Sequence, residues 1–215
     1  MTFFQIEVRA IYEQHDTHAH KLAREILQLS AQQIPSLAEI SAASSPLSIR
    51  TAQLYHLSGD LSPSQLEQLT RQLLVDPVVQ EVSSGHLLDD AATGHIVDVF
   101  FHHGVTDTLA ESVITGAQML GITALERVET GQRYVLDRRL SESDAQTIAR
   151  SLLCNNVIQH YAFYKADFVG TDEVSSMDDQ TRIPSSTNVP ITTFPLSTMN
   201  DEQLMEVSRA GLPPL

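Results

Sequence analysis

A long internal match places the tightest constraint on how this chain can fold. Shifting the 215-residue sequence by 79 positions aligns residues 51–82 with 130–161 without a gap, and 12 of these 32 positions are identical. Chance at ordinary residue frequencies would give about two or three identities. A second match, at a shift of 91, places "DTHA" (16–19) on "DTLA" (107–110). The pattern predicts an internal duplication, with an insertion in the first copy within 34–48.

Each copy is predicted to contain a strand, a helix, two strands, a second helix and a last strand. Alternating apolar and polar residues predict the strands, and the spacing of Leu22, Ile26 and Leu29 predicts the first helix. Ser62, followed by Pro63, begins the second helix with a capping box, and Ser141 with Asp144 repeats this start in the second copy. In the first copy the predicted strands are 4–10, 36–41, 50–57 and 78–82, and the first helix is 17–33.

A β-α-β-β-α-β unit places both helices on one face of a small antiparallel sheet, which is the ferredoxin-like arrangement. The predicted fold class is therefore α+β, a tandem repeat of two such units. Residues 96–101 have large apolar side chains on both faces of the expected strand, so the second face of the sheet needs a cover. We expect the two copies to pack their open sheet faces on each other, as a pseudo-dimer within one chain.

The repeat pattern stops after Lys165. The following residues are rich in Ser, Thr, Asp and Pro, with isolated apolar side chains, so we expect them to run extended over a surface. Asn200 and Gly211 have the properties of helix start and stop signals. The predicted parts are a first repeat at 1–84, a connector at 85–94, a second repeat at 95–165 and an extended linker at 166–215 with a short helix at 200–210.

Composition narrows the classes of function. Asp and Glu number 27 against 13 Lys and Arg, a formal charge of −14, which opposes binding to nucleic acid or to anionic membranes. Cys154 is the single cysteine, so no intrachain disulfide forms and a reducing compartment is expected. The charged, strand-like start differs from a signal peptide, and no apolar run has the length of a membrane span. The predicted location is the cytoplasm.

The segment "HDTHAH" (15–20) is the strongest metal-ligating pattern, because imidazole and carboxylate groups at close spacing bind zinc or nickel. However, His15 precedes the expected helix, whereas His18 and His20 fall in its first turn and do not share one face. The equivalent positions of the second copy contain no histidine. A solvated loop is the favoured interpretation here and at His102-His103, and no metal site is predicted.

Asp16-Thr17 and Asp107-Thr108 occur at the start of the first helix in the two copies. A carboxylate there could orient a ligand, but these residue types also cap the unpaired backbone amides of a helix, which is the favoured interpretation. Cys154 ends an amphipathic helix and aligns with Val75, which favours a core thiol over a nucleophile. The sequence has no glycine-rich phosphate loop and no nucleophile elbow. No catalytic residue and no cofactor are predicted.

The second copy has the segment "HGVTDT" (103–108) after its first strand, and the second helices of the two copies end in "DPVVQ" (76–80) and "NNVIQ" (155–159). With these segments the two copies resemble the PurS family, the small accessory subunit of phosphoribosylformylglycinamidine (FGAM) synthase, which has a strand followed by "PGVTDP" and later a capped helix ending in "DPVIQ". The first motif is matched with His and Thr in place of two prolines, and "DPVVQ" fits the second motif better than "NNVIQ" does. In fused forms of this enzyme, the N-terminal region is similar to a PurS dimer on one chain, and the linker that follows it has a short helix resembling residues 196–211.

The resemblance implies a role in purine biosynthesis, where glutamine-derived ammonia converts formylglycinamide ribonucleotide to its amidine at the expense of ATP. It implies a non-catalytic part that bridges the synthetase and the glutaminase and helps enclose the ammonia path. The nucleotide, substrate and glutaminase residues of the family lie in domains without a counterpart in these 215 residues. The resemblance fits both a separate subunit and the front of a longer fused synthase.

Two other hypotheses belong to different classes. A tandem ferredoxin-like regulatory domain would bind a small metabolite at a glycine-bearing loop after the first strand. Gly104 offers such a loop in the second copy, whereas "YEQHDT" (12–17) in the first copy has no glycine. A metal-binding protein built on "HDTHAH" is the third hypothesis.

Overall fold

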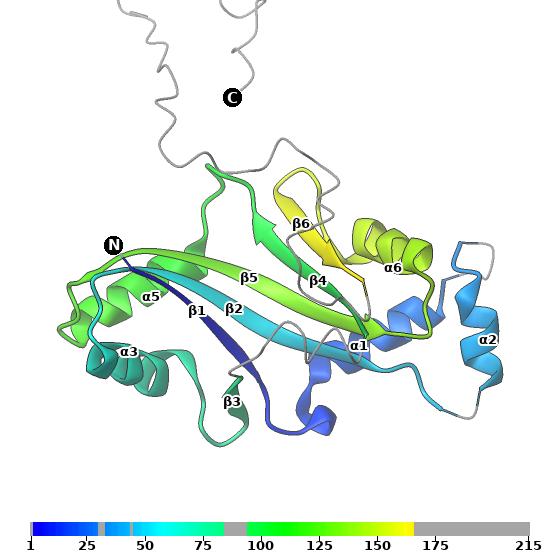
Figure 1. Ribbon diagram of the computed structural model, residues 1–215, viewed down its shortest axis with the longest axis horizontal. Helices are drawn as coiled ribbons and strands as arrows, with labels where there is room; N and C mark the ends of the chain where they lie inside the picture. The colour runs from blue at the N-terminus through cyan, green and yellow to red at the C-terminus, as the bar shows by residue number, and fades with distance from the viewer. Residues whose placement is uncertain (1, 30–32, 44, 84–93, 166–215) are drawn as a thin grey trace, which may run out of the picture. The chain divides into compact units, whose positions relative to one another are not determined.

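The computed structural model describes residues 2–29, 33–43, 45–83 and 94–165 (Figure 1). The predicted linker at 166–215, with its short helix, lies outside the described residues, as does nearly all of the predicted connector at 85–94. No helix within the described ranges is both long and apolar enough to cross a membrane.

The described residues form a six-stranded antiparallel sheet with helices packed on one face (Figure 1), so the predicted α+β class is confirmed. The strand order is β3-β1-β2-β5-β4-β6, and the architecture is compatible with ferredoxin-like units. The strands are β1 (Thr2–Ala10), β2 (Ile49–Gly59), β3 (Gln80–Ser83), β4 (Gly94–Phe101), β5 (Leu125–Asp137) and β6 (Gln159–Tyr164). The helices are α1 (Thr17–Leu27), α2 (Ser36–Ala42), α3 (Pro63–Leu69), α5 (Thr108–Met119) and α6 (Glu142–Ile148).

The strand predicted at 36–41 is wrong, because this segment is helix α2. Its buried apolar residues, Leu37 and Ile40, lie three positions apart, which is the spacing of a helix face rather than of a strand. One long strand in each half, β2 or β5, takes the place of the two strands predicted between the helices. Helix α1 also ends at Leu27, earlier than predicted.

The expected sandwich of two sheets is also wrong, because the halves join edge to edge in one sheet. Strands β2 and β5 pair antiparallel over most of their lengths, and Gln53 lies directly opposite Gln132. These two residues are also equivalent when the sequence is shifted by 79 positions. The Gln53 amide donates to the backbone oxygen of Gly131 and the Gln132 amide to that of Ala52, both at 2.9 Å. Each glutamine side chain therefore binds the backbone of the opposite strand near the centre of the sheet.

The second helix of each half begins at a serine cap and ends in the same unusual turn. The Ser62 hydroxyl oxygen accepts a hydrogen bond from the backbone N–H of Gln65, and the Gln65 side-chain oxygen accepts one from the backbone N–H of Ser62. The predicted capping box is therefore confirmed. Helix α3 then widens into one π-helical turn, Thr70–Leu74, and α6 does so at Ala149–Leu153. Leu74 and Leu153 are buried by this change of pitch.

Two apolar clusters lie under the helices, and each combines elements from both halves. Helix α1, from the first half, packs with α2, α6, β4 and β6, whereas α5, from the second half, packs with α3 and β1. Figure 1 shows α1 beside α2 and α6, with α5 beside α3 at the opposite end of the sheet. The first helix of each half thus completes the core of the other, so neither half buries its apolar residues alone.

Candidate functional site

The aspartates at the two predicted helix caps have the same role in both halves. Asp16 accepts hydrogen bonds from the backbone N–H of Ala19 at 2.8 Å and from both the N–H and the hydroxyl of Thr51 at 2.7 and 2.8 Å. Asp107 accepts from Ala110 at 2.9 Å and from Thr130 at 2.8–3.0 Å. Each carboxylate therefore ties a helix start to a central strand, as well as capping the helix.

The histidines of "HDTHAH" do not converge on one point. His15 lies edge-on to Tyr12, with ring centroids 5.4 Å apart, and His18 lies edge-on to Tyr134 at 5.7 Å. Asp16 is occupied by the hydrogen bonds given above. The structure groups no three His, Cys, Asp or Glu side chains in a metal-binding arrangement among the residues it describes.

Cys154 is buried in the apolar cluster beneath α6, and burial raises the pKa of its thiol. Burial, with a smaller contribution from Cys154, likewise raises the pKa of the neighbouring Tyr134 to about 12. Both groups are therefore protonated at neutral pH, and a protonated buried thiol is a poor nucleophile. This environment is that of a core side chain.

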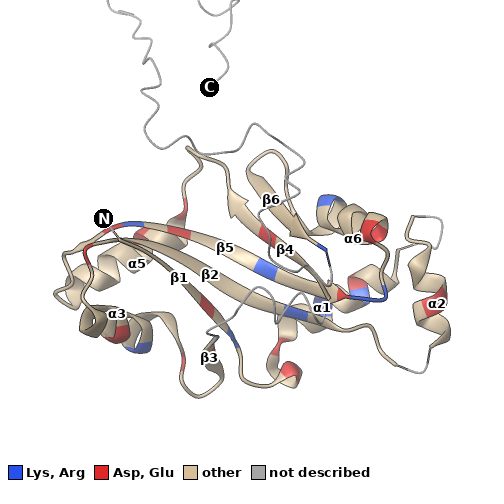
Figure 2. Ribbon diagram, viewed as in Figure 1, with Lys and Arg blue, Asp and Glu red and all other residues tan. Residues whose placement is uncertain are grey.

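An ion-pair network spans the sheet face opposite the helices. Arg133 on β5 binds Asp98 on β4 through two hydrogen bonds of 2.7 Å, and its third nitrogen binds Glu7 on β1 at 2.7 Å. All three side chains are buried, with exposed fractions of 2–7%. Because β2 lies between β5 and β1, Arg133 reaches Glu7 across that strand, where the short side chain of Ala52 lies opposite Arg133. Figure 2 shows the basic segment of β5 between acidic segments of β1 and β4.

In this network, two carboxylates at equivalent positions of the two halves, Glu7 and Asp98, bind the one guanidinium of Arg133. Glu7 and Asp98 correspond under the shift of 91 positions, whereas Arg133 corresponds to Leu54 under the shift of 79 positions. Our sequence reasoning missed these residues. The available signal was a single acidic residue within the apolar part of the first strand of each half. Since burying a charge is costly without a partner, an acidic residue in such a strand predicts a buried cation nearby.

A row of rings crosses the same face of the sheet. The ring of Phe100 on β4 lies 4.7 Å from that of His56 on β2 and 6.1 Å from that of His160 on β6. Strand β5 lies between β4 and β2 and has Gly131 beside the Phe100 ring. A Cβ at this position would lie only 2.4 Å from that ring, so glycine leaves the space that the ring occupies. Burial lowers the pKa of both His56 and His160, so both imidazoles are neutral at pH 7.

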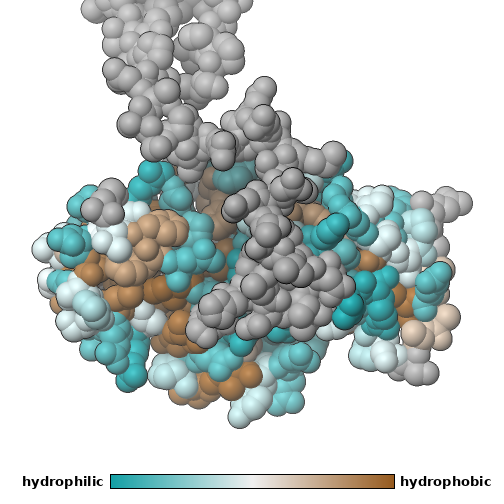
Figure 3. All heavy atoms as spheres, viewed as in Figure 1, coloured by the Kyte–Doolittle hydropathy of each residue, from teal (hydrophilic) through white to brown (hydrophobic). Residues whose placement is uncertain are grey.

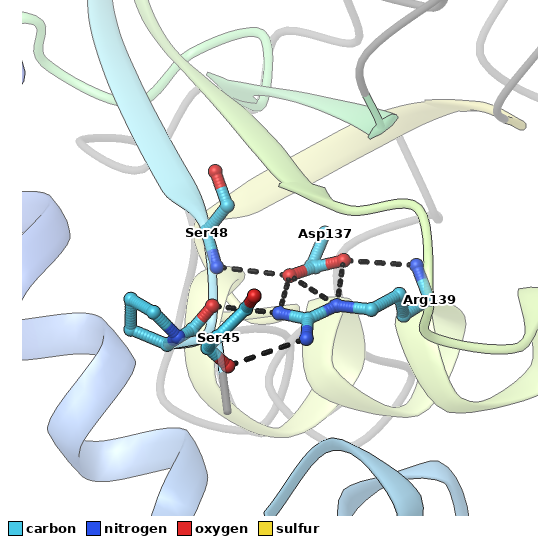
Figure 4. Close-up of polar contacts among 5 residues, drawn as sticks. Ser45, Ser48, Asp137 and Arg139 are labelled. Atoms are coloured by element: carbon cyan, nitrogen blue, oxygen red, sulfur yellow. Dashed lines mark hydrogen bonds and ion pairs between the residues drawn. The ribbon is translucent and has the colours of Figure 1, made fainter. Parts of the chain in front are cut away.

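A polar clamp holds the loop before β2 against the end of β5 (Figure 4). Arg139 binds the carboxylate of Asp137 and donates to the backbone oxygens of Ser45 and Pro46, while Ser48 N–H donates to Asp137 at 2.9 Å. Burial acts to raise the pKa of Asp137, but the hydrogen bonds from Arg139 and Ser48 outweigh it, so this pKa lies below its ordinary value. Since the clamped loop follows α2, the clamp fixes the predicted insertion to the second half.

The glycine-bearing loop of the regulatory hypothesis is a tight backbone turn. Gly104 has φ of 89°, and Val105 N–H donates to the His102 backbone oxygen at 3.1 Å. A positive φ is a conformation that glycine adopts without a steric penalty. The turn geometry therefore accounts for this glycine without a ligand.

Comparison with known proteins identifies one part of the chain. The family model of PurS, described as phosphoribosylformylglycinamidine (FGAM) synthase, matches residues 95–166. This region is therefore PurS-like, as the sequence resemblance predicted, and it covers β4, α5, β5, α6 and β6. No curated protein matches the chain. The match associates the region with FGAM synthase and purine biosynthesis.

Proposed function

We propose that this chain is a non-catalytic assembly part of FGAM synthase, in which two PurS-like repeats form a pseudo-dimer. The observation that carries the proposal is the pairing of β2 with β5, where Gln53 lies opposite Gln132. The region that matches PurS is thereby joined, in register, to a first half with the same order of strands and helices. The insertion that contains α2 is the main departure from this order.

Equivalent contacts in the two halves support a tandem repeat. The Asp16–Thr51 junction corresponds to Asp107–Thr130 under the two shifts of the sequence match. The exchange of α1 and α5 supports the pseudo-dimer, since two repeats that complete each other's cores fold as one unit. In these terms the repeats are 1–84 and 95–165, with a connector at 85–94 and a linker at 166–215.

The partners in this proposal are the synthetase and the glutaminase of the same enzyme, which the chain bridges while helping to enclose ammonia transfer. The engagement of Asp16, Asp107, Asp137 and the Glu7–Arg133–Asp98 network in structural contacts supports a role in assembly. The excess of acidic residues opposes binding to nucleic acid and to anionic membranes, and is consistent with action in the cytoplasm. The metabolite-binding hypothesis has no comparable support, because its glycine turn occurs in one half.

The test is complex formation with the synthetase and glutaminase of the same organism, measured by light scattering. A stable complex whose mass includes all three proteins is expected. The chain with Arg133→Met is a comparison of lower stability, which should form the complex only under conditions in which it remains folded. If the correctly folded chain leaves both proteins at their free masses, the assembly role is wrong.

A further inference from the structure

The sheet face opposite the helices, here named the open face, carries buried apolar side chains although no helix among the described residues packs on it (Figure 1). Side chains alternate along a strand, so Leu54, Ile96 and Val135 share this face with Arg133 and its two carboxylates. The exposed fractions of the three apolar residues are 0%, 0% and 7%. An apolar sheet face is buried against another element, and these values indicate that the open face has a cover.

Residues 84–93 join the end of β3 to the start of β4, two strands that lie on opposite sides of the central pair β2 and β5. Four strand spacings separate them, which is about 19 Å across the sheet. The register places Ser83 in the row of Phe100. Gly94 lies six residues before Phe100 (100 − 94), which is about 20 Å along the strand. The direct path between the two ends is therefore about 28 Å long.

The length of residues 84–93 restricts the route that they can take. The 11 steps from Ser83 to Gly94 (94 − 83) span about 36–40 Å when fully extended. A path over the helices is at least about 20 Å longer than the direct one, because a helix is about 10–12 Å in diameter. A path around the ends of the strands is about 39 Å long and leaves no length for passing the loops there. The direct path across the open face fits with length to spare.

The handedness of the connections leads to the same face. Strands β2 and β3 both pair antiparallel with β1, and β2 and β4 both pair antiparallel with β5, so β2, β3 and β4 run in one direction. Connections between parallel strands of one sheet are almost always right-handed. The connection from β2 to β3 passes through α3 on the helix face. The connection from β3 to β4 travels back in the opposite direction, so the same hand places it on the open face.

We propose that the open face is the docking surface for residues 84–93 of the chain itself, which cross it diagonally from β3 to β4 over β1, β2 and β5. Leu87 and Leu88 are the large apolar side chains of this segment, and they are the anchors that pack on the buried apolar residues of the face. Figure 3 shows apolar surface around β3, where the segment begins.

This placement goes beyond the proposed function and does not depend on it. The segment that joins the two halves in sequence also fastens them in space, because it lies over strands of both. It also closes the open face to other proteins, so a partner of this chain binds the helical layer or the edges of the sheet.

The experiment measures how fast a maleimide reagent labels a cysteine introduced on the open face of the full chain. Cys154→Ala removes the natural thiol, Val135→Cys is the probe, and Met119→Cys, at a site 84% exposed on α5, is the accessible reference. We expect the probe to react at least about 100-fold more slowly than the reference, because it reacts only when its cover opens. Adding Leu87→Ser/Leu88→Ser should speed labelling of the probe at least about tenfold, since both anchors lose their apolar surface.

The matched control is Phe168→Ser/Ile183→Ser, which removes two apolar side chains from the residues that follow β6 and should leave the labelling rate unchanged. Thermal melts check that each variant is folded. If the leucine variant does not fold, cross-linking decides. A short bifunctional maleimide should join the cysteines of the pair Leu88→Cys/Val135→Cys within one chain, but not those of the pair Leu88→Cys/Met119→Cys, as read by mass spectrometry of a digest.

Three results would overturn the placement. Faster labelling in Phe168→Ser/Ile183→Ser, without faster labelling in the leucine variant, would show that residues after β6 cover the face. A labelling rate that rises on dilution of the chain would show that a second copy covers it. Unchanged labelling in a folded leucine variant, or no cross-link between positions 88 and 135, would show that residues 84–93 lie elsewhere. Complex formation with the synthetase is measured separately, so the assembly role stands or falls independently of these results.

Discussion

The two ends of the helical layer differ in composition. At one end, α1 and α6 share an apolar cluster with the extra helix α2. At the other end, α5 and α3 share a cluster with residues of the short turn before β5, and no extra helix is present among the described residues. The difference is visible in two equivalent side chains. Gln65 closes a capping box on its own Ser62, but Asp144 accepts a hydrogen bond at 2.8 Å from the backbone N–H of Ser36, at the start of α2. The capping box predicted for Ser141 and Asp144 is therefore only half present. The Asp144 side chain instead binds the start of helix α2, within the insertion.

The two ends of the helical layer share their junctions but differ at the insertion. The junctions at Asp16 and Asp107, which both halves need, use the same hydrogen bonds. The insertion is fixed by groups that lack counterparts in the first half, since Asp137 and Arg139 correspond to Ser58 and Asp60. The two ends of the helical layer therefore differ chemically, although the two junctions are alike.

The largest expected effect concerns the shared cation. Arg133→Met leaves Glu7 and Asp98 buried without their partner, so we expect a loss of about 3–5 kcal/mol in the free energy of unfolding, measured by urea denaturation. The matched control is Leu54→Met at the equivalent position of the first half, which changes shape without changing charge and should cost less than about 1.5 kcal/mol.

The triple variant Glu7→Gln/Asp98→Asn/Arg133→Met removes the charges together. We expect it to recover much of the stability lost by Arg133→Met, because no carboxylate is then left buried without a partner. A triple variant as unstable as the single one would show that packing, rather than charge, is what Arg133 provides.

The second expected effect tests whether the two junctions are equivalent. Asp16→Ala and Asp107→Ala each remove a helix cap and two hydrogen bonds to a threonine, so we expect each to cost about 2–3 kcal/mol, measured by thermal or urea unfolding. The two costs should agree within about 0.5 kcal/mol, because the same hydrogen bonds are removed at both junctions. A much larger loss in the free energy of unfolding for one variant than for the other would show that the two junctions are not equivalent.

The third effect is confined to the α2 end and depends on pH. The pKa of Asp137 lies below its ordinary 3.8 in the folded chain, so the unfolded chain takes up a proton first as the pH falls. The stabilisation is therefore present above about pH 4 and is lost as the pH drops through the folded pKa. Asp137→Asn should flatten the acid side of the stability curve, whereas Ser58→Asn at the equivalent position should leave it unchanged.

The smallest effect concerns His56 and His160. Their pKa values are lowered, so the unfolded chain binds protons more readily, and folding stability should fall as the pH drops below about 6.5. His160→Gln should reduce this decline in urea unfolding measured between pH 7 and 5. An unchanged decline in His160→Gln would show that His160 has the same pKa in both states.

The sequence predicted those elements whose signals are local. Alternation identified β1 and β2, and Ser62 with Pro63 and Gln65 identified the start of α3, because a cap depends on neighbouring residues alone. Helix α2 was missed although the three-residue spacing of Leu37 and Ile40 is compatible with a helix.

The arrangement of the halves could not be predicted from the same signals. Apolar residues on both faces of β4 are compatible with a sandwich and with a continuous sheet, and the choice depends on which edges pair. The exchange of α1 and α5 is likewise a tertiary property, since an apolar helix face does not specify which half it covers. The contact of Arg133 with Glu7 depends on strand order, because the two residues are separated by β2.

The most direct test of the account is a titration of glutamine-dependent FGAM synthase activity. The synthetase and glutaminase of the same organism are held fixed while this chain is added, and a parallel series supplies ammonia directly. We expect glutamine-dependent activity to rise and to saturate at one chain per synthetase, because one chain contains both halves of the pseudo-dimer, while ammonia-dependent activity stays constant. Saturation at two chains, or glutamine-dependent activity that is unaffected by the chain, would contradict the account.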